Sequence, residues 1–156
     1  MNVPPEGRVV VSACLAGVPC THDAEGKPRE WAARLLAEGR ALLVCPEVAG
    51  GLPIPRPASE VDGGDGGDVL DGHARVVDER GADVTDAFVR GAARAVEVAR
   101  RHGATLAILK ARSPSCGCGQ TYDGTFTGTL RTGDGVTAAA LKREGLRVAS
   151  DEDIVR

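Results

Sequence analysis

Five cysteines carry the clearest chemical signal in this 156-residue chain, and they are Cys14, Cys20, Cys45, Cys116 and Cys118. The last two stand one residue apart in S-P-S-C-G-C-G, among glycines, serines and a proline. The N-terminus lacks the basic and apolar regions of a signal peptide, so we expect a cytoplasmic protein. In that reducing compartment cysteines point to metal binding, redox chemistry or a nucleophile rather than to disulfides.

Three of the cysteines follow apolar runs that predict buried strands. Cys14 comes directly after 8–13, Cys45 directly after 41–44, and Cys116 a few residues after 105–110. The carboxyl ends of parallel strands meet at one edge of a sheet, where ligands bind. We therefore expect these three thiols to converge there.

The number of converging thiols is informative, because three ligands leave a position open. A structural zinc site is closed by four protein ligands, and most iron–sulfur clusters are held by four cysteines. Three cysteines therefore indicate chemistry at the metal rather than a structural role. The alternative for each cysteine is an ordinary buried small residue. Cys20 could be a fourth ligand, a sulfur relay or a packed residue, and we favour a packed or auxiliary role; we interpret Cys118 as an incidental surface thiol.

The elements that would position these residues alternate between strands and helices. Apolar residues at helical spacing predict helices over 29–39, 83–103 and 135–145, and L-R-V-A over 146–149 predicts a fourth strand. This order predicts a single α/β domain over 1–156, with three layers and a mainly parallel, Rossmann-like sheet of about four strands. The segment 46–71 is dense in Gly and Pro and is interpreted as a long loop with a flexible tip at 63–67.

Composition excludes some classes of partner. The formal net charge is −3, aromatic residues make up 3% of the chain, and Lys and Arg form no stripe, so we expect no nucleic acid polymer as a partner. No apolar run approaches the length of a membrane span, so we expect no membrane association. The sequence does not fix the oligomeric state.

Several motifs together resemble a known family. In order along 9–150, they are V-S-A-C-L-A-G-V-P-C, C-P-E-V-A-G-G-L-P-I-P-R-P-A-S-E, V-L-D-G-H-A-R-V-V, L-K-A-R-S-P-S-C-G and Y-D-G-T-F-T-G-T-L-R-T-G-D-G-V-T-A. They closely resemble a bacterial family that includes the thiouracil desulfidases. The resemblance implies a [4Fe–4S] cluster held by Cys14, Cys45 and Cys116 with one iron open. It also implies a thiolated nucleobase as substrate, whose sulfur is replaced by oxygen from water without redox change.

The resemblance assigns the catalytic residues as well. It implies that Glu47, two residues after Cys45, is the general acid/base, and that a serine of S-P-S-C-G assists it. That serine is Ser113 or Ser115, and we rank Ser113 first. The alternative for Glu47 is a solvated loop carboxylate, which its position directly after Cys45-Pro46 disfavours. Arg56 has two open interpretations: it binds an anionic or carbonyl group of the substrate, or it forms an ion pair that pins the long loop.

Two alternatives from other classes stay open at this point. One is a non-enzymatic module that binds zinc or carries sulfur, with Cys20 or Cys118 as a fourth ligand. The other is a thiol hydrolase with Cys116 as nucleophile, although no histidine stands in an obvious partnering motif.

Overall fold

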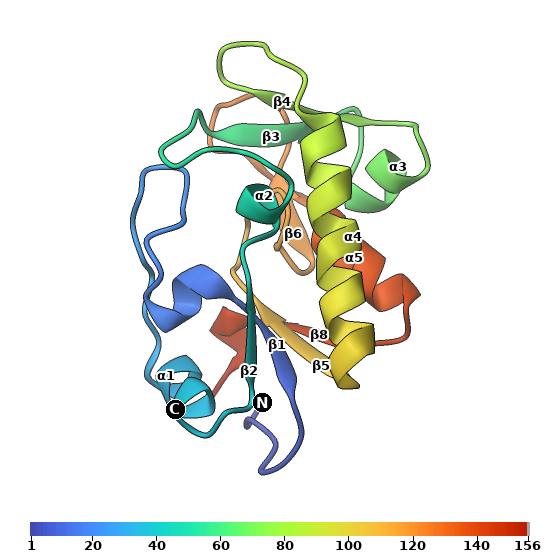
Figure 1. The fold of residues 1–156 in the computed structure, drawn as a ribbon. Helices are drawn as coiled ribbons and strands as arrows, with labels where there is room; N and C mark the ends of the chain where they lie inside the picture. The colour runs from blue at the N-terminus through green and yellow to red at the C-terminus, as the bar shows by residue number, and fades with distance from the viewer. Residues whose placement is uncertain (156) are drawn as a thin grey trace.

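A four-stranded parallel sheet forms the centre of the molecule (Figure 1). The computed structural model describes residues 1–155. The strand order is β2-β1-β5-β8, and the bounds are β1 (Val9–Ser12), β2 (Ala41–Val44), β5 (Leu106–Leu109) and β8 (Arg147–Ser150). All three neighbouring pairs are parallel. The predicted sheet and its four strands are therefore confirmed.

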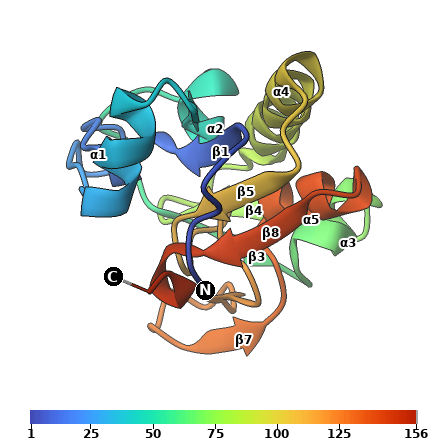
Figure 2. The same cartoon turned by 90° about the horizontal axis from the view of Figure 1, so that it is seen from below.

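Helices cover both faces of the sheet and give the three predicted layers (Figure 2). In β1, Val9 and Val11 join a core with Leu35 of α1, whereas Val10 points to the opposite core with Ala95 of α4. This alternation follows from the two-residue period of a strand. The helices of these layers are α1 (Glu30–Ala37), α4 (Thr85–His102) and α5 (Val136–Arg143). The predicted α/β class is confirmed.

The segment 46–71 differs from the predicted long loop, because it contains three short elements. These are α2 (Pro46–Ala49), β3 (Ser59–Asp62) and α3 (Gly66–Leu70), and β3 pairs with the antiparallel strand β4 (Arg75–Asp78). Pro46 stands in the first turn of α2, where its missing N–H costs nothing. Asp65 and Asp68 form a capping box that starts α3, so the predicted flexible tip is instead a helix start.

A β-hairpin lies within the segment 113–133, where the sequence analysis named no strand. Its strands are β6 (Gln120–Tyr122) and β7 (Leu130–Thr132). Glu60 of β3 accepts hydrogen bonds from the backbone N–H groups of Gly124 and Phe126 in the hairpin turn, at 2.9 and 3.2 Å. The hairpin is therefore tied to β3. Short 3-10 turns follow β1 and β8, namely η1 (Ala13–Ala16) and η2 (Asp151–Asp153).

Two glycines bring α2 and α4 into backbone contact. A Cβ atom at Gly50, which ends α2, would collide with the backbone carbonyl of Ala87 in α4. A Cβ atom at Gly91 in α4 would collide with the carbonyl of Pro46 in α2. Glycine is required at both positions because the two backbones approach so closely. This contact sets where α2 lies on the molecule.

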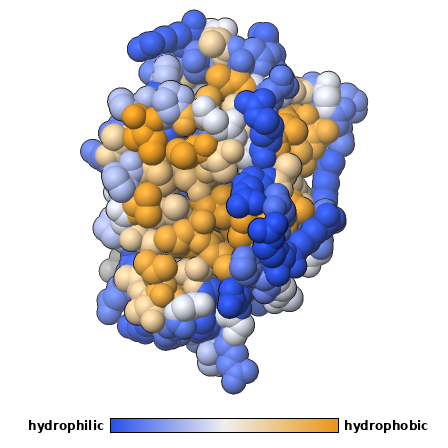
Figure 3. Space-filling model, viewed as in Figure 1, coloured by the Kyte–Doolittle hydropathy of each residue, from blue (hydrophilic) through white to orange (hydrophobic). Residues whose placement is uncertain are grey.

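The edge of the sheet at β2 carries apolar side chains that remain partly accessible. Ala41, Leu42 and Leu43 are half-buried because β2 has a neighbour on one side only. Val48 and Ile54 are exposed nearby in sequence, and Figure 3 shows apolar side chains gathered across the face that Figure 1 presents. Within residues 1–155, no helix is both long and apolar enough to cross a membrane.

Candidate functional site

A cavity of about 430 Å³ opens at the carboxyl ends of the central strands. Its lining includes four of the five cysteines, together with both predicted catalytic serines and the predicted catalytic glutamate. The structure therefore brings together every residue that the sequence analysis named for the site: Cys14, Cys45, Cys116, Glu47, Ser113 and Ser115.

The backbone presents each of the three cysteines from a different strand end. Cys14 lies in η1 immediately after β1, and Cys45 is the residue that precedes the first turn of α2. Cys116 lies in a turn beyond β5, closed by a hydrogen bond of 2.8 Å from the N–H of Gly117 to the carbonyl of Ser113. Cys14 and Cys116 are buried, and Cys45 is half-buried. The convergence expected from the strand order is thus present in the fold.

The pKa values of three cavity thiols, those of Cys20, Cys45 and Cys116, are raised, which favours their neutral form. Burial raises the pKa of Cys116 to about 12, and its side chain is only 3% exposed. Contact with the Cys20 thiol raises the pKa of Cys45 far above its ordinary value, and burial adds to the shift. Contact with Cys14 likewise raises the pKa of Cys20. A buried neutral thiol is a poor nucleophile, so the geometry does not favour the thiol-hydrolase alternative for Cys116.

Glu47 and the two serines form one hydrogen-bonded chain. Glu47 stands in α2, and its Oε2 accepts a hydrogen bond of 3.0 Å from the Oγ of Ser115. The Oγ atoms of Ser113 and Ser115 are 3.0 Å apart. Because a hydroxyl has one proton and Ser115 gives its own to the carboxylate, Ser113 is the donor to Ser115. The hydrogen bonds therefore run in one direction, from Ser113 to Ser115 and from Ser115 to Glu47.

The two serines differ in what else they contact. The buried Oγ of Ser115 also lies 3.7 Å from the Sγ of Cys116, so it contacts both the carboxylate and a thiol. The Oγ of Ser113 accepts backbone hydrogen bonds from the N–H groups of Ser115 and Cys116, at 3.2 and 3.0 Å. Ser113 thus shapes the turn, whereas Ser115 touches the groups that could react. This contrast favours Ser115, and the sequence analysis ranked Ser113 first.

Arg56 is a buried partner of Glu47 that the sequence analysis left with two interpretations. Its Nε donates to the Oε1 of Glu47 at 3.0 Å, and its side chain is 4% exposed. The guanidinium also donates to the backbone carbonyls of Pro53 and Cys20, at 3.1 and 2.9 Å. The interpretation as an ion pair that pins the loop is the one that the geometry supports.

The two remaining cysteines, Cys20 and Cys118, differ in whether they line the cavity. Cys20 is buried in the cavity lining beside Cys14 and Cys45, and its carbonyl lies 3.6 Å from the Sγ of Cys45. Cys118 is absent from the described lining, and its Sγ contacts the carbonyl of Val148 in β8 at 3.5 Å. Over residues 1–155, no group of three or more His, Cys, Asp or Glu side chains is arranged to hold a metal ion.

Comparison with known proteins decides the family. The model of the 2-thiouracil desulfurase family matches residues 9–153. This chain belongs to that family. Among relatives, the uncharacterized protein YbbK of Bacillus subtilis (strain 168) is 43% identical over 146 residues, which is 94% of this chain and 97% of YbbK.

A solved structure of the same family agrees with the fold. The [4Fe-4S]-dependent thiouracil desulfidase TudS matches with a TM-score of 0.83 and 44% sequence identity. The match covers 94% of this chain and 92% of TudS. The family resemblance noted from the sequence motifs is therefore confirmed, and membership of the desulfurase family identifies the chain as an enzyme.

Proposed function

We propose that this protein removes sulfur from a thiolated nucleobase such as 2-thiouracil, at a [4Fe–4S] cluster held by Cys14, Cys45 and Cys116. A C=S group and water become a C=O group and hydrogen sulfide, so both protons of the water leave with the sulfur and no electrons are exchanged. The observation that carries the proposal is one cavity in which three strand-end thiols face a hydrogen-bonded Glu47–Ser115 pair.

The residues present fit a cluster better than a single ion. The donors are three thiols delivered by three separate backbone segments to one cavity, which is a soft, all-sulfur ligand set. A zinc ion would need its ligands to converge at about 2.3 Å from one point. Each cysteine of a cluster instead binds its own iron, so thiols from three separate backbone segments need not meet at one point. The donor arrangement therefore favours the cluster over the zinc-binding alternative.

When bound on three cysteines, the cluster supplies an open iron, a Lewis acid suited to soft thione sulfur. The protein must then supply water activation and proton transfer. We assign both tasks to Glu47, and two observations support this: its side chain is 13% exposed in the cavity, and one carboxylate oxygen accepts a hydrogen bond from Ser115. Its role is to take a proton from the attacking water and return it to the departing sulfur.

Ser115 acts next to the carboxylate. Its hydroxyl lies between Glu47 Oε2 and Cys116 Sγ, so it can hold the carboxylate toward the site and pass a proton to or from it. Ser113 supports Ser115 from behind by donating to its Oγ and by fixing the turn that carries Cys116. In this assignment Glu47 and Ser115 are catalytic, and Ser113 is a positioning residue.

The remaining lining suits a small planar heterocycle. The cavity volume of about 430 Å³ falls within the range of ordinary small-molecule sites. Tyr122 of β6 contributes an aromatic ring to the lining, on which a pyrimidine can stack. Sheet and hairpin together would enclose the base, with its sulfur directed toward the cysteines.

The first test is spectroscopic and uses protein that has been purified and reconstituted without oxygen. We expect a brown protein with about four irons and four sulfides per chain. Added 2-thiouracil should lose its thione absorption while sulfide appears, and uracil serves as the matched ligand without a thione. A colourless protein holding one zinc would contradict the cluster, and a loaded cluster without turnover would contradict the substrate class.

A further inference from the structure

We propose that Arg56 is a positioning residue for the reaction: it holds one oxygen of Glu47 so that the other faces Ser115 and the substrate. The inference rests on the proposed function of Glu47 as the acid/base. The Glu47 carboxylate accepts two hydrogen bonds, each of 3.0 Å: Oε1 accepts one from Arg56 Nε, and Oε2 accepts the other from Ser115 Oγ. The carboxylate is therefore fixed from both sides.

The guanidinium is anchored independently of Glu47. Its Nη1 donates to the carbonyl of Pro53 and its Nη2 to the carbonyl of Cys20, so two backbone segments hold the fork in place. The N–H of Arg56 also donates to the carbonyl of His22 at 2.8 Å, which fixes the base of the side chain. A fork that is already immobile can orient a carboxylate at little entropic cost.

The same contacts argue against direct substrate binding by Arg56. All three nitrogens of the guanidinium donate to protein acceptors, and the side chain is 4% exposed. A substrate anion would have to displace Glu47 or a carbonyl from a buried site. Arg56 thus acts through Glu47 and not on the substrate.

Loss of Arg56 should affect catalysis more than binding. Glu47 lies in the four-residue helix α2, and without the anchor its carboxylate can rotate away from Ser115. General acid/base catalysis needs the carboxylate within hydrogen-bond reach of the transferred proton. Misplacement by about 1 Å is enough to reduce the rate about 100-fold. The Michaelis constant should change little, because the Arg56 side chain is 4% exposed and each of its nitrogens already donates to the protein.

The experiment compares Arg56→Met, Arg56→Lys and the control Arg40→Met in cluster-loaded enzyme. Arg40 is anchored in a similar way, by the carbonyls of Gly7 and Pro4 at 2.8 and 2.7 Å and by Glu38 at 3.1 Å, but it is not among the described residues that line the site cavity. We expect Arg56→Met to lower kcat about 100-fold with KM within about threefold and iron content unchanged. Arg56→Lys should recover part of kcat because it restores the charge without the fork. Arg40→Met should keep the kcat of the wild type.

Several outcomes would overturn the inference. A kcat within threefold of the wild type in Arg56→Met would remove the positioning role. A rise in KM alone would make Arg56 a substrate ligand, and loss of iron in both Arg56 variants would make it a structural residue.

A crystal structure of Arg56→Lys, or of Arg56→Met, gives a readout that does not depend on turnover. We expect Glu47 to leave hydrogen-bond distance of Ser115 in the variant, and an unchanged contact would overturn the inference. If the wild-type enzyme does not desulfurate 2-thiouracil at all, this structural readout still decides the role of Arg56. Failure of the inference and failure of the proposed function are therefore distinguishable.

Discussion

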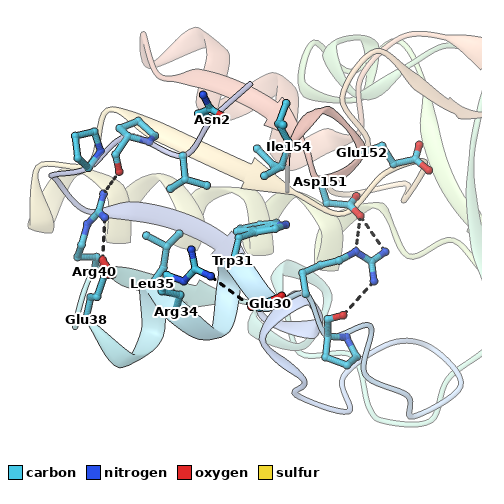
Figure 4. A pocket seen from close by; sticks show the side chains of 16 residues that line it. Asn2, Glu30, Trp31, Arg34, Leu35, Glu38, Arg40, Asp151, Glu152 and Ile154 are labelled. Atoms are coloured by element: carbon cyan, nitrogen blue, oxygen red, sulfur yellow. Dashed lines mark hydrogen bonds and ion pairs between the residues drawn. The ribbon is translucent and has the colours of Figure 1, made fainter.

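Two cavities of this protein differ in size and in what their polar groups do. The larger one, about 1150 Å³, is a groove between residues 2–5, helix α1 and residues 151–155. Figure 4 shows its three arginines directed at neighbouring carboxylates. Three ion pairs result: Arg29 with Asp151, Arg34 with Glu30, and Arg40 with Glu38. The remaining charged side chain of the lining, Glu152, pairs with Arg112.

The smaller cavity holds groups that are directed at its interior. Four cysteines line it, three of them buried, and Glu47 is held there by a buried arginine on one side and a serine on the other. Several thiols gathered beside a carboxylate in one pocket are the groups from which an active or metal site is built. The comparison teaches that volume alone does not locate chemistry in this fold: ion pairs line both cavities, but only the smaller one gathers cysteines beside its carboxylate.

The sharpest test of the contrast removes the thiols. Cys14→Ala, Cys45→Ala and Cys116→Ala should each lose the cluster and all desulfuration, because an open [4Fe–4S] site has no ligand to spare. Iron and sulfide content of anaerobically purified protein measures the effect. Cys118→Ala is the control, since its thiol contacts β8 outside the described lining. Retention of iron in all three variants would sink the ligand assignment.

The next effect in size concerns the carboxylate. Glu47→Gln preserves shape and should retain iron, but it cannot accept a proton, so we expect kcat to fall about 10²–10⁴-fold. Steady-state kinetics with 2-thiouracil checks this, with Glu97→Gln on the exposed side of α4 as the control. Full activity of Glu47→Gln would remove this residue from the mechanism.

Substitution of the two serines should affect different properties, kcat for Ser115 and the free energy of unfolding for Ser113. Ser115→Ala loses the donor to Glu47, and we expect kcat to fall about 10²-fold with iron retained. Ser113→Ala loses an acceptor of two backbone N–H groups, and we expect a loss of about 1 kcal/mol in the free energy of unfolding with a smaller change in kcat. Kinetics and denaturant unfolding of both variants decide between them. A larger kcat loss in Ser113→Ala would restore the ranking made from the sequence.

The smallest expected effect on activity comes from the groove. Trp31→Ala removes a partly buried ring that packs against the core cluster of α1, so we expect a loss of about 2 kcal/mol in the free energy of unfolding. The kcat of the loaded enzyme should match the wild type. Unfolding curves and kinetics on the same preparation test both parts. A tenfold loss of kcat with iron retained would show that the groove takes part in catalysis, and the contrast between the cavities would break.

The strand ends could be predicted from the sequence because their signal is local. Predicting that Cys14 follows β1 and that Cys45 follows β2 requires only a run of apolar residues before each cysteine. Predicting that the two thiols lie at one edge requires only the rule for parallel sheets. That rule was enough to bring Cys116 to the same edge as well. The sheet and the three thiols were thus accessible without any distance information.

The partners of Glu47 could not be predicted in the same way. Its helix α2 has four residues and its start is marked only by Pro46, so the sequence showed no helical period there. The contacts of Glu47 with Arg56 and Ser115 span 9 and 68 positions in the chain. Such contacts arise from how loops fold over the sheet edge. The β6–β7 hairpin was missed because its strands have three residues each.

The glycine contact between α2 and α4 has a consequence for laboratory evolution of this enzyme. Gly91 lies on a long helix, away from the residues that line the cavity, and a mutagenesis library aimed at substrate range would treat it as free to vary. A methyl group at Gly91 would collide with the carbonyl of Pro46, which directly precedes Glu47 in the chain. The collision would change the position of the Glu47 carboxylate without altering the identity of any lining residue. Libraries should therefore hold Gly50 and Gly91 constant, or use them deliberately as a fine adjustment of the catalytic distance.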